Sequence, residues 1–385
     1  MAPKALLDRF SRWQGEMLSL LEQLVNIDSG TGQRAGIEAI LDILEPKLKE
    51  LGFATRRHPS PVGPHLVAEG TEQPQVLLMG HIDTVFPAGT AAQRPFRIDG
   101  NRAYGPGVMD MKAGIVTMIY VLKALALSGD LHRNARVIIN ADEEISSIHS
   151  RDLIQQESRR CQAAFVFEPA RSMDEVTTRR KGVGDLTIQV KGRAAHAGAA
   201  PEDGLSAIQE LARIAVALHG LTDLERGLSV NVGVVSGGTA RNVIAEHAQA
   251  RVDLRFATKA DGEWLMQHVR DVCAPSHPGY QIQVVGDITR PPLERRPDIV
   301  ALFQHVQEAG RALGIELQES SSGGVSDANL IADAGVPVID SMGPVGGNAH
   351  SDAEYLEIDT IVPRAALAAW SIHEWLARQS QRAAS

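Results

Sequence analysis

Apolar residues near the start of the chain recur at intervals of three and four positions. They are Leu6, Leu7, Phe10, Trp13, Met17, Leu20, Leu21 and Leu24. This spacing places their side chains on one face of a helix, so we expect an amphipathic helix here. A second helix is expected over about residues 36–50, ending at Gly52.

Four later apolar runs are short and continuous instead of periodic. They read "QVLLMG", "ARVIINA", "AAFVFEP" and "VPVIDSM". Such runs are typical of strands that are buried on both faces. Helical patterns lie between them, among them the long apolar stretch "DMKAGIVTMIYVLKALALSG". Strands alternating with helices predict an α/β domain, with a mixed, mostly parallel sheet and helices on both faces.

The pattern changes near residue 182. "GDLTIQVKG" alternates apolar and polar residues, as expected of a strand in a sheet that has one buried and one solvent-exposed face. A helix, two strands, a second helix near 261–272 and the strand "YQIQVV" follow. Together they predict a β-α-β-β-α-β unit. We therefore expect a catalytic domain in two segments, 1–181 and 294–385, with a smaller α+β domain inserted at 182–293.

Composition narrows the classes of function. At 385 residues the chain is long enough for two domains, and 44% apolar with 22% charged residues is ordinary for a globular protein. A net charge of −9 argues against nucleic-acid binding, and no apolar stretch is long enough to cross a membrane. Cys161 and Cys273 are too few for a disulfide framework or a thiolate zinc site. We expect a cytoplasmic protein, or a periplasmic one if a leader peptide has been removed.

Side chains that can bind metal follow each buried strand of the first segment. His81 and Asp83 follow the first strand, Glu143 and Glu144 the second, and Glu168 the third. The carboxyl ends of parallel strands meet at one edge of a sheet, where ligands bind in α/β folds. These side chains are therefore expected to converge.

Two more candidates lie in loops. Asp110 is in the glycine-rich loop "GPGVMDMKAG", and His350 follows the last apolar strand. Carboxylates crowded together raise one another's pKa values unless a cation compensates. Two zinc ions would balance Asp110, Glu144 and Glu168, with neutral imidazoles completing their ligand shells. Oxygen and nitrogen ligands suit a catalytic zinc pair, and cobalt or manganese could substitute.

The neighbouring glutamates suggest a division of labour. Glu144 is assigned as a metal ligand and Glu143 as the general base that faces the metal-bound water. Asp83 lies two residues after His81, so it can orient that imidazole. A solvated acidic turn would account for the glutamates alone, but not for a histidine or acid at every strand end.

Six motifs together resemble the M20 metallopeptidases, the aminoacylase and glutamate carboxypeptidase group with a two-zinc centre. They read "MGHIDTV", "GPGVMDMKAG", "NADEEIS", "VFEP", "GRAAHAGAAPEDG" and "NAHSDAEYLEI". They occur in the family's order over nearly the whole chain. "HAGAAPE" and "GPG" most resemble the bacterial glutamate carboxypeptidase branch, which acts on folates.

The resemblance implies roles for individual residues. Asp110 would bridge two zinc ions, one also held by His81 and Glu168, the other by Glu144 and His350. Glu143 would be the base and Asp83 the partner of a ligand. His196, in the inserted domain, would stabilise the oxyanion, often from the partner subunit. Contacts to substrate are implied for Asn242, Arg255, Arg290 and the glycine turn at Gly323 and Gly324, with Arg255 binding the terminal carboxylate.

The inserted domain of the family serves as lid and dimerisation domain, so a homodimer with hinge closure is implied. Two positions depart from the family pattern. Ser146 stands where glycine is usual, and Ala245 stands where proline is common. Neither change removes a ligand, but both lie where the shape of the pocket is decided.

The expected activity is hydrolysis of the amide bond to a C-terminal amino acid, releasing glutamate from folate-like or N-acyl glutamates. A broader hydrolase of N-acyl amino acids or aryl-acyl amides is the alternative. A non-catalytic metal-binding assembly protein is a remote one, since it would have no use for Glu143 and its metal site would favour thiolates.

Overall fold

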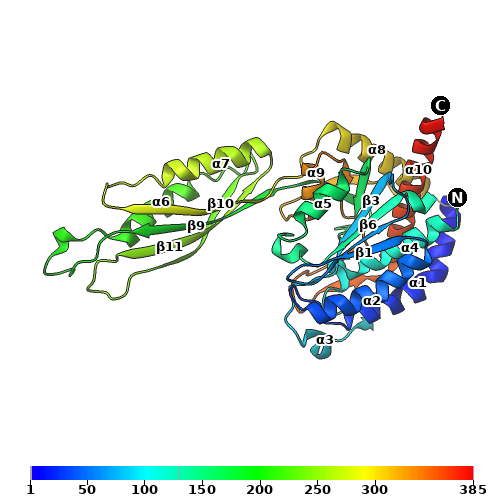
Figure 1. The fold of residues 1–385 in the computed structure, drawn as a ribbon, viewed down its shortest axis with the longest axis horizontal. Helices are drawn as coiled ribbons and strands as arrows, with labels where there is room; N and C mark the ends of the chain where they lie inside the picture. The colour runs from blue at the N-terminus through cyan, green and yellow to red at the C-terminus, as the bar shows by residue number, and fades with distance from the viewer. Residues whose placement is uncertain (1, 130, 385) are drawn as a thin grey trace. The chain divides into compact units, whose positions relative to one another are not determined.

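The computed structural model describes residues 2–129 and 131–384. The chain divides into two compact units (Figure 1). The first holds the residues up to Thr178, Arg295–Ser321 and the residues from Ser326 on. The second holds Arg179–Glu294 and the short segment Ser322–Val325. That segment, which includes Gly323 and Gly324, was expected in the catalytic domain.

A six-stranded sheet forms the centre of the first unit, in the order β1-β2-β6-β3-β7-β14. Its strands are β1 (Ala54–His58), β2 (His65–Glu69), β3 (Val76–His81), β6 (Ala135–Asn140), β7 (Ala163–Val166) and β14 (Val338–Ile339). Strands β3, β6, β7 and β14 run parallel, while β2 pairs antiparallel with β6 and β1 with β2. The prediction of a mixed, mostly parallel sheet is confirmed.

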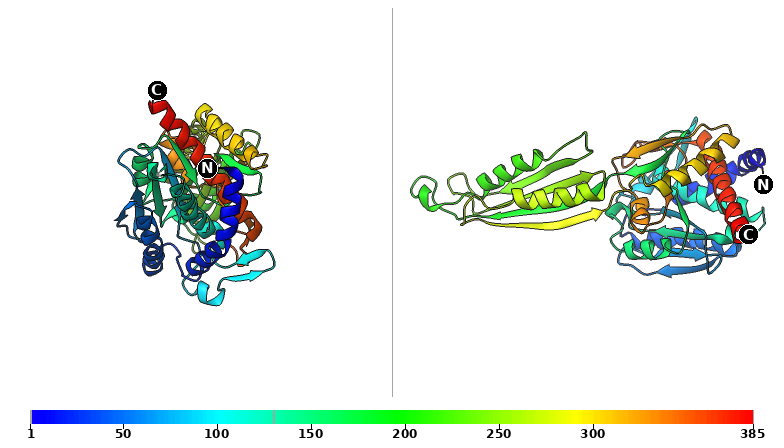
Figure 2. Two further views of the ribbon diagram at one scale, coloured as in Figure 1. Left: turned by 90° about the vertical axis from the view of Figure 1, so that its right-hand side faces the viewer. Right: turned by 90° about the horizontal axis from the view of Figure 1, so that it is seen from above.

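The helices of the first unit lie around this sheet, with the short α3 apart from it (Figure 1). They are α1 (Pro3–Val25), α2 (Arg34–Glu50), α3 (Thr90–Gln93), α4 (Gly114–Ala126), α5 (Arg151–Ser158), α8 (Pro297–Ala312), α9 (Asp327–Asp333) and α10 (Ile361–Ala384). Every residue of β3 and β6 is buried, as expected of strands covered on both faces. The first and last helices, α1 and α10, lie side by side (Figure 2). Both contribute buried residues to the same hydrophobic core.

The long predicted helix begins later than its apolar pattern suggested. A π-helical turn, Val108–Ala113, precedes α4, and Asp110 within it has non-helical φ and ψ of −106° and 95°. A Cβ at Gly114 would lie 1.9 Å from the carbonyl oxygen of Phe167. Only glycine therefore lets the start of α4 pack against the chain that follows β7. This close approach brings the Asp110 loop beside Glu168.

Two small sheets accompany the large one, and the second of them has strands that end just beyond the bounds of the first unit. One has the order β15-β16-β5-β4, and the other pairs β13 with β8. Their bounds are β4 (Arg97–Asp99), β5 (Arg102–Tyr104), β8 (Glu175–Arg180), β13 (Gln318–Ser322), β15 (Gly346–Gly347) and β16 (Tyr355–Glu357). The pairing of β16 with β5 joins the loop that carries His350 to the loop that carries Asp110.

The second unit is a four-stranded antiparallel sheet, β10-β11-β9-β12, with two helices on one face (Figures 1 and 2). Its elements are β9 (Gly182–Lys191), α6 (Ala207–His219), β10 (Ser229–Gly237), β11 (His247–Phe256), α7 (Lys259–Val272) and β12 (Gln281–Arg290). The alternate residues Leu186, Ile188 and Val190 face the core with both helices. The predicted β-α-β-β-α-β order is confirmed. In the described part of the chain, no helix is both long and apolar enough to span a membrane.

Candidate metal centre

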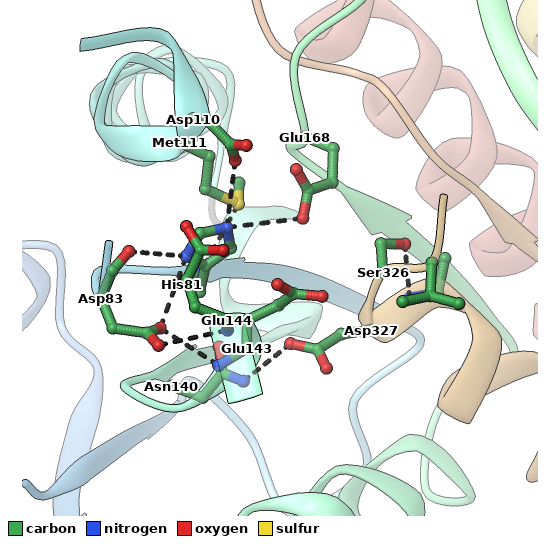
Figure 3. Close-up of polar contacts among 12 residues, drawn as sticks. His81, Asp83, Asp110, Met111, Asn140, Glu143, Glu144, Glu168, Ser326 and Asp327 are labelled. Carbon is green, nitrogen blue, oxygen red and sulfur yellow. Dashed lines mark hydrogen bonds and ion pairs between the residues drawn. The ribbon is translucent and has the colours of Figure 1, made fainter. Parts of the chain in front are cut away.

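The sheet brings the predicted ligands of its strands to one edge. His81 ends β3 and pairs in register with Asn140, the last residue of β6. Glu143 and Glu144 follow in a short 3₁₀ turn, Glu143–Ile145. Glu168 comes two residues after β7 ends. Parallel strands thus deliver one imidazole and three carboxylates to the same place (Figure 3).

Asp110 lies between two histidines. Its Oδ1 is 3.3 Å from His81 Nε2, and its Oδ2 is 3.3 Å from His350 Nε2. His81 Nε2 also lies 3.6 Å from Glu168 Oε1, and His350 Nε2 lies 3.2 Å from Glu144 Oε2. Two sets of nitrogen and oxygen atoms therefore share one carboxylate. This is the arrangement that a carboxylate bridging two cations requires.

The spacing and charge of these groups fit divalent metal ions. Ligands held tetrahedrally at about 2.0–2.2 Å from zinc lie about 3.3–3.6 Å from one another, close to the separations found here. Burial, together with the carboxylates of Asp110, Glu143 and Asp340, raises the pKa of Glu168 well above its usual value. Hydrogen bonds to Asp110 and Glu144 raise the pKa of His350 to about 10. The site thus attracts positive charge, which protons supply when no metal is bound.

Asp83 orients His81 and also holds the glutamate turn. Nδ1 of His81 lies 3.0 Å from the carbonyl oxygen of Asp83, so this nitrogen carries the hydrogen and leaves Nε2 for a metal. The buried Asp83 carboxylate accepts the backbone N–H groups of Glu143 and Glu144 at 3.1 and 3.2 Å. Thr31 Oγ1 donates to it at 2.7 Å. The sequence analysis predicted an orienting role for Asp83 toward His81, but it did not predict the contacts of Asp83 with the glutamate turn and with Thr31.

A buried polar network supports the turn from behind. Asn140 Nδ2 donates to Oδ2 of Asp327, the first residue of α9 (Figure 3). Ser147 Oγ donates to the other carboxylate oxygen of Asp327. Asp142 accepts Ser150 Oγ and the backbone N–H groups of residues 149 and 150. The side chains of Asn140, Asp142, Ser147 and Ser150 are fully buried. The network therefore fixes both ends of the turn that presents Glu143.

Glu354 is a further residue that sequence reasoning did not identify. Its buried carboxylate accepts the backbone N–H groups of Met109 and Asp110 at 2.9 and 3.1 Å on one oxygen. Its other oxygen accepts the N–H of Gly107 at 3.2 Å. The only sequence signal was its place in "NAHSDAEYLEI", the motif that contains His350.

Comparison with known proteins now places this centre in a family. The profile of peptidase family M20/M25/M40 matches residues 77–373. The chain belongs to this family. Carboxypeptidase G2 of Pseudomonas sp. (strain RS-16) is 34% identical over 369 residues, covering 92% of this chain and 88% of the relative.

Two further similarities complete the comparison. Succinyl-diaminopimelate desuccinylase of Delftia acidovorans is 30% identical over 382 residues, covering 90% of this chain and 94% of the relative. The crystal structure of aminopeptidase PepT from Bacillus cereus superposes with a TM-score of 0.81 at 22% identity, covering 94% and 98% of the two chains. That identity shows a shared fold. The predicted family is confirmed, and the M20 protein is a metallohydrolase enzyme.

Ser146, the departure from the M20 pattern, lies in the left-handed region of backbone conformation. Its φ is 71°, and that of Ser147 is 51°. Glycine adopts this region without steric cost, which explains the usual glycine at this position. Here the hydrogen bonds of Ser147 and its neighbours hold the same turn with serine.

In the second unit of the M20 chain, His196 has a defined tautomer. Its Nδ1 accepts the backbone N–H groups of Gly198 and Ala199 at 3.2 and 3.1 Å. The neutral ring therefore carries its hydrogen on Nε2, which can donate. The carbonyl of Asn242 accepts the N–H of Ala197 at 3.0 Å, which joins the loops of the two predicted residues.

Arg255 already has a carboxylate partner. Its Nε and Nη2 bind the two oxygens of Asp253 at 2.9 and 3.0 Å, and its Nη1 lies 3.4 Å from the carbonyl of Gly323. The carbonyl of Gly324 accepts Arg180 Nη1 at 3.3 Å. Arg290 is fully buried. The substrate-binding roles given to these residues stay predictions.

Proposed function

We propose that this protein is a two-metal amidohydrolase that removes a C-terminal amino acid, with glutamate as the preferred product. The observation that supports it most is the Asp110 carboxylate, whose two oxygens each face a different histidine at 3.3 Å. Glu143 stands in the same turn as the ligand Glu144. The similarity to carboxypeptidase G2 supports the choice of reaction.

The ligand assignment follows the two sets of atoms. His81, Asp110 and Glu168 would hold one metal, and His350, Asp110 and Glu144 the other. We propose zinc for both, with cobalt or manganese able to substitute. When bound, the metals supply polarisation of the scissile carbonyl and acidification of water.

Glu143 acts as the proton carrier in this mechanism. It takes a proton from the water that attacks the carbonyl carbon, and delivers it to the amide nitrogen as the carbon–nitrogen bond breaks. The products are a carboxylic acid and a free amino acid. The Nε2–H of His196 is proposed to donate to the oxygen that becomes negative, and this contact is strongest in the transition state.

Arg255 is proposed to bind the terminal carboxylate of the substrate. Since Asp253 occupies two of its nitrogens, the substrate would meet Nη1 beside Gly323 and Gly324 or displace Asp253. Asn242 would contact the substrate from the His196 loop. Arg290, as a buried cation, is the second candidate for an acidic group of the substrate.

The inserted domain is proposed to serve as lid and as dimer contact. In that arrangement His196 completes the active site of the partner subunit in a homodimer. The proposal rests on family resemblance and on the placement of His196 in the second unit.

A broader N-acyl-amino-acid hydrolase is the second candidate. The desuccinylase of Delftia acidovorans, 30% identical, favours it because its name describes removal of an acyl group from an amino acid. Both candidates use the same metals and base, and they differ only in the groups that the pocket accepts.

A substrate panel separates the two candidates. The zinc-loaded protein is offered folate, N-benzoylglutamate, N-acetylated amino acids and N-succinyl-diaminopimelate, and release of the amino acid is measured. We expect the glutamate conjugates to be cleaved fastest. Glu143→Gln should lower kcat by about 10²–10⁴-fold while both metals remain bound. Cleavage of acyl amino acids but not of glutamate conjugates would replace the first candidate by the second.

A further inference from the structure

We propose that Glu354 is a positioning residue, which sets the bridging carboxylate of Asp110 against His350 so that the pair can bind two metals. The inference rests on the proposed function for its metal site. It adds a residue outside the ligand set, with a role that can be measured without any substrate.

The contacts of Glu354 are directed at the backbone of the Asp110 loop. Its Oε1 accepts Met109 N–H at 2.9 Å and Asp110 N–H at 3.1 Å, and its Oε2 accepts Gly107 N–H at 3.2 Å. The residue is 1% exposed. Three donors from one loop thus converge on a single buried carboxylate.

These bonds satisfy backbone N–H groups in an irregular stretch of chain, where a left-handed glycine leads into a distorted π-helical turn. Gly107 has a φ of 70°, and Asp110 departs from helical geometry within the π-helical turn. Buried N–H groups in such a segment need acceptors from elsewhere. Glu354 supplies them, and it does so at the residue whose side chain would bridge the metals.

The segment that carries Glu354 also carries His350, and internal hydrogen bonds make it compact. Ser351 Oγ donates to the carbonyl of Asn348 at 2.7 Å, and Glu354 N–H donates to the carbonyl of Ser351 at 3.2 Å. Asn348 Nδ2 donates to the carbonyl of Ala353 at 3.3 Å. His350 and Glu354 therefore belong to one loop that is held together by its own hydrogen bonds.

A strand pair anchors both loops at their bases. Tyr355, directly after Glu354, pairs with Tyr104, directly before Gly105. One strand of this pair leads along the chain through Gly107 to Asp110, and the other lies next to Glu354 and, four residues earlier, His350. The hydrogen bonds of Glu354 to the Asp110 loop therefore link the two segments close to the proposed metal ligands. Its removal should therefore let Asp110 and His350 separate, although both ligands remain.

The predicted effect is on metal affinity. Residues that orient metal ligands typically contribute about 10–100-fold to affinity, so Glu354→Gln should raise the dissociation constant by that factor. The glutamine N–H₂ would face either the N–H of Gly107 or those of Met109 and Asp110, so its oxygen can accept only the bonds on the other side. The ion held by Asp110, Glu144 and His350 should be lost first.

The test is a cobalt titration of the metal-free protein, followed by calorimetry and by the visible absorption of bound cobalt. The wild type should bind two ions. Glu354→Gln should bind the second more weakly by about 10–100-fold and show an altered cobalt spectrum, while its metal-free melting temperature shows that it is folded. Glu357→Gln, three residues along in β16, is the matched control and should behave as the wild type.

Three outcomes overturn the proposal. Wild-type affinity and spectrum in Glu354→Gln would do so, and so would equal losses in Glu357→Gln. If Glu354→Gln is unfolded, Glu354→Asp replaces it, since this variant keeps the charge but its shorter side chain cannot reach all three donors. Full affinity in that variant would also overturn the proposal. A wild type that binds metals but cleaves no amide would reject the proposed function and leave the Glu354 result standing.

Discussion

At the scale of single residues, Asp83 holds two parts of the centre, one through its backbone carbonyl and the other through its carboxylate. Asp83 fixes the tautomer of His81 through its carbonyl and binds the backbone of Glu143 and Glu144 through its side chain. His81 and the turn of Glu143 and Glu144 are thereby held by the same buried residue. Thr31 is the side-chain donor that completes this arrangement.

Removal of the Thr31 hydroxyl should therefore lower the catalytic rate, although Thr31 is not a predicted metal ligand or base. Thr31→Val keeps the shape but deletes the 2.7 Å bond to Asp83. We expect kcat/KM to fall by about tenfold or more, because the turn that holds Glu143 loses a constraint. Thr90→Val is the matched control: it loses a 2.7 Å bond to the Pro87 carbonyl nearby and should keep its kcat/KM. Equal effects in the two variants would contradict the prediction.

Metal binding should release protons. In the metal-free protein, hydrogen bonds to Asp110 and Glu144 raise the pKa of His350 to about 10. Although burial opposes it, hydrogen bonds to Asp110 and Asp83 also raise the pKa of His81 well above its usual value. Both rings must lose a proton before they bind metal. Apparent affinity should therefore rise with pH towards 10, and calorimetry in buffers of different ionisation heat should detect the release of protons on metal binding.

The same shift has a consequence for stability. A raised pKa in the folded state means that protonated His350 stabilises the metal-free fold below its unfolded pKa of about 6.5. This contribution is lost as the pH rises through about 10.

The share of His350 in the proton release on metal binding can be tested by mutation. His350→Ala should release about one proton fewer on metal binding than the wild type. Proton release that is unchanged in this variant would refute the assignment.

At the scale of elements, hydrogen bonds between the helices of the second unit predict its response to acid. Burial acts to raise the pKa of Glu210 in α6, but hydrogen bonds from Arg213 and Ser276 outweigh it and lower the pKa to about 2. Ser276, just after α7, donates to Glu210 through its N–H at 2.9 Å and its hydroxyl at 2.5 Å. The Glu210 carboxylate thus joins the first turn of α6 to the chain that follows α7.

Glu210→Gln should destabilise the second unit by about 1–3 kcal/mol near neutral pH. A lowered folded pKa gives stability that is present above the unfolded value of about 4.5 and lost as the pH falls through about 2. The difference between variant and wild type should therefore shrink over that range in denaturant titrations. Glu202→Gln, on the exposed turn before α6, is the control. A difference that stays constant with pH would refute the prediction.

Elements with a strong apolar signal were predictable, and those made by distant pairing were not. β3, β6 and β7 are continuous apolar runs, so both the strands and the convergence of the side chains that follow them could be predicted from the sequence. β1 reads "ATRRH", while β5, β15 and β16 have two or three residues each. Such strands form because partners far along the chain meet them, and no local pattern reports this.

The same distinction holds in the site. His81, Asp110, Glu144 and Glu168 could be predicted as ligands because each follows a strand or lies in a glycine-rich loop. Glu354 acts on backbone groups 244 to 247 residues earlier in the chain, and Asp327 reaches Asn140 over 187 residues. Side chains that support a site from such distances resemble ordinary surface acids in the sequence.

At the scale of the whole molecule, the chain passes between the two units more often than an inserted domain requires. It crosses at 178–179 and 294–295, as expected for an insertion, and again on both sides of Ser322–Val325. That segment carries Gly323, whose carbonyl accepts Arg255. It continues into Ser326 and Asp327, which belong to the first unit. The residue proposed to bind the substrate carboxylate is thus linked by a few residues of chain to the network behind Glu143.

If His196 completes the site of a partner subunit, two inactive variants should restore each other. Glu143→Ala lacks the base, and His196→Ala lacks the donor. In a mixed dimer, the chain that keeps Glu143 would receive His196 from the Glu143→Ala chain, so one of the two sites is whole. Random mixing makes about half of the dimers mixed, which predicts about a quarter of wild-type activity after the two variants are unfolded and refolded together. Each variant refolded alone should stay inactive. Activity at the level of the separate variants, in a mixture shown to contain mixed dimers, would place His196 in the site of its own chain and remove the reason for the enzyme to act as a dimer.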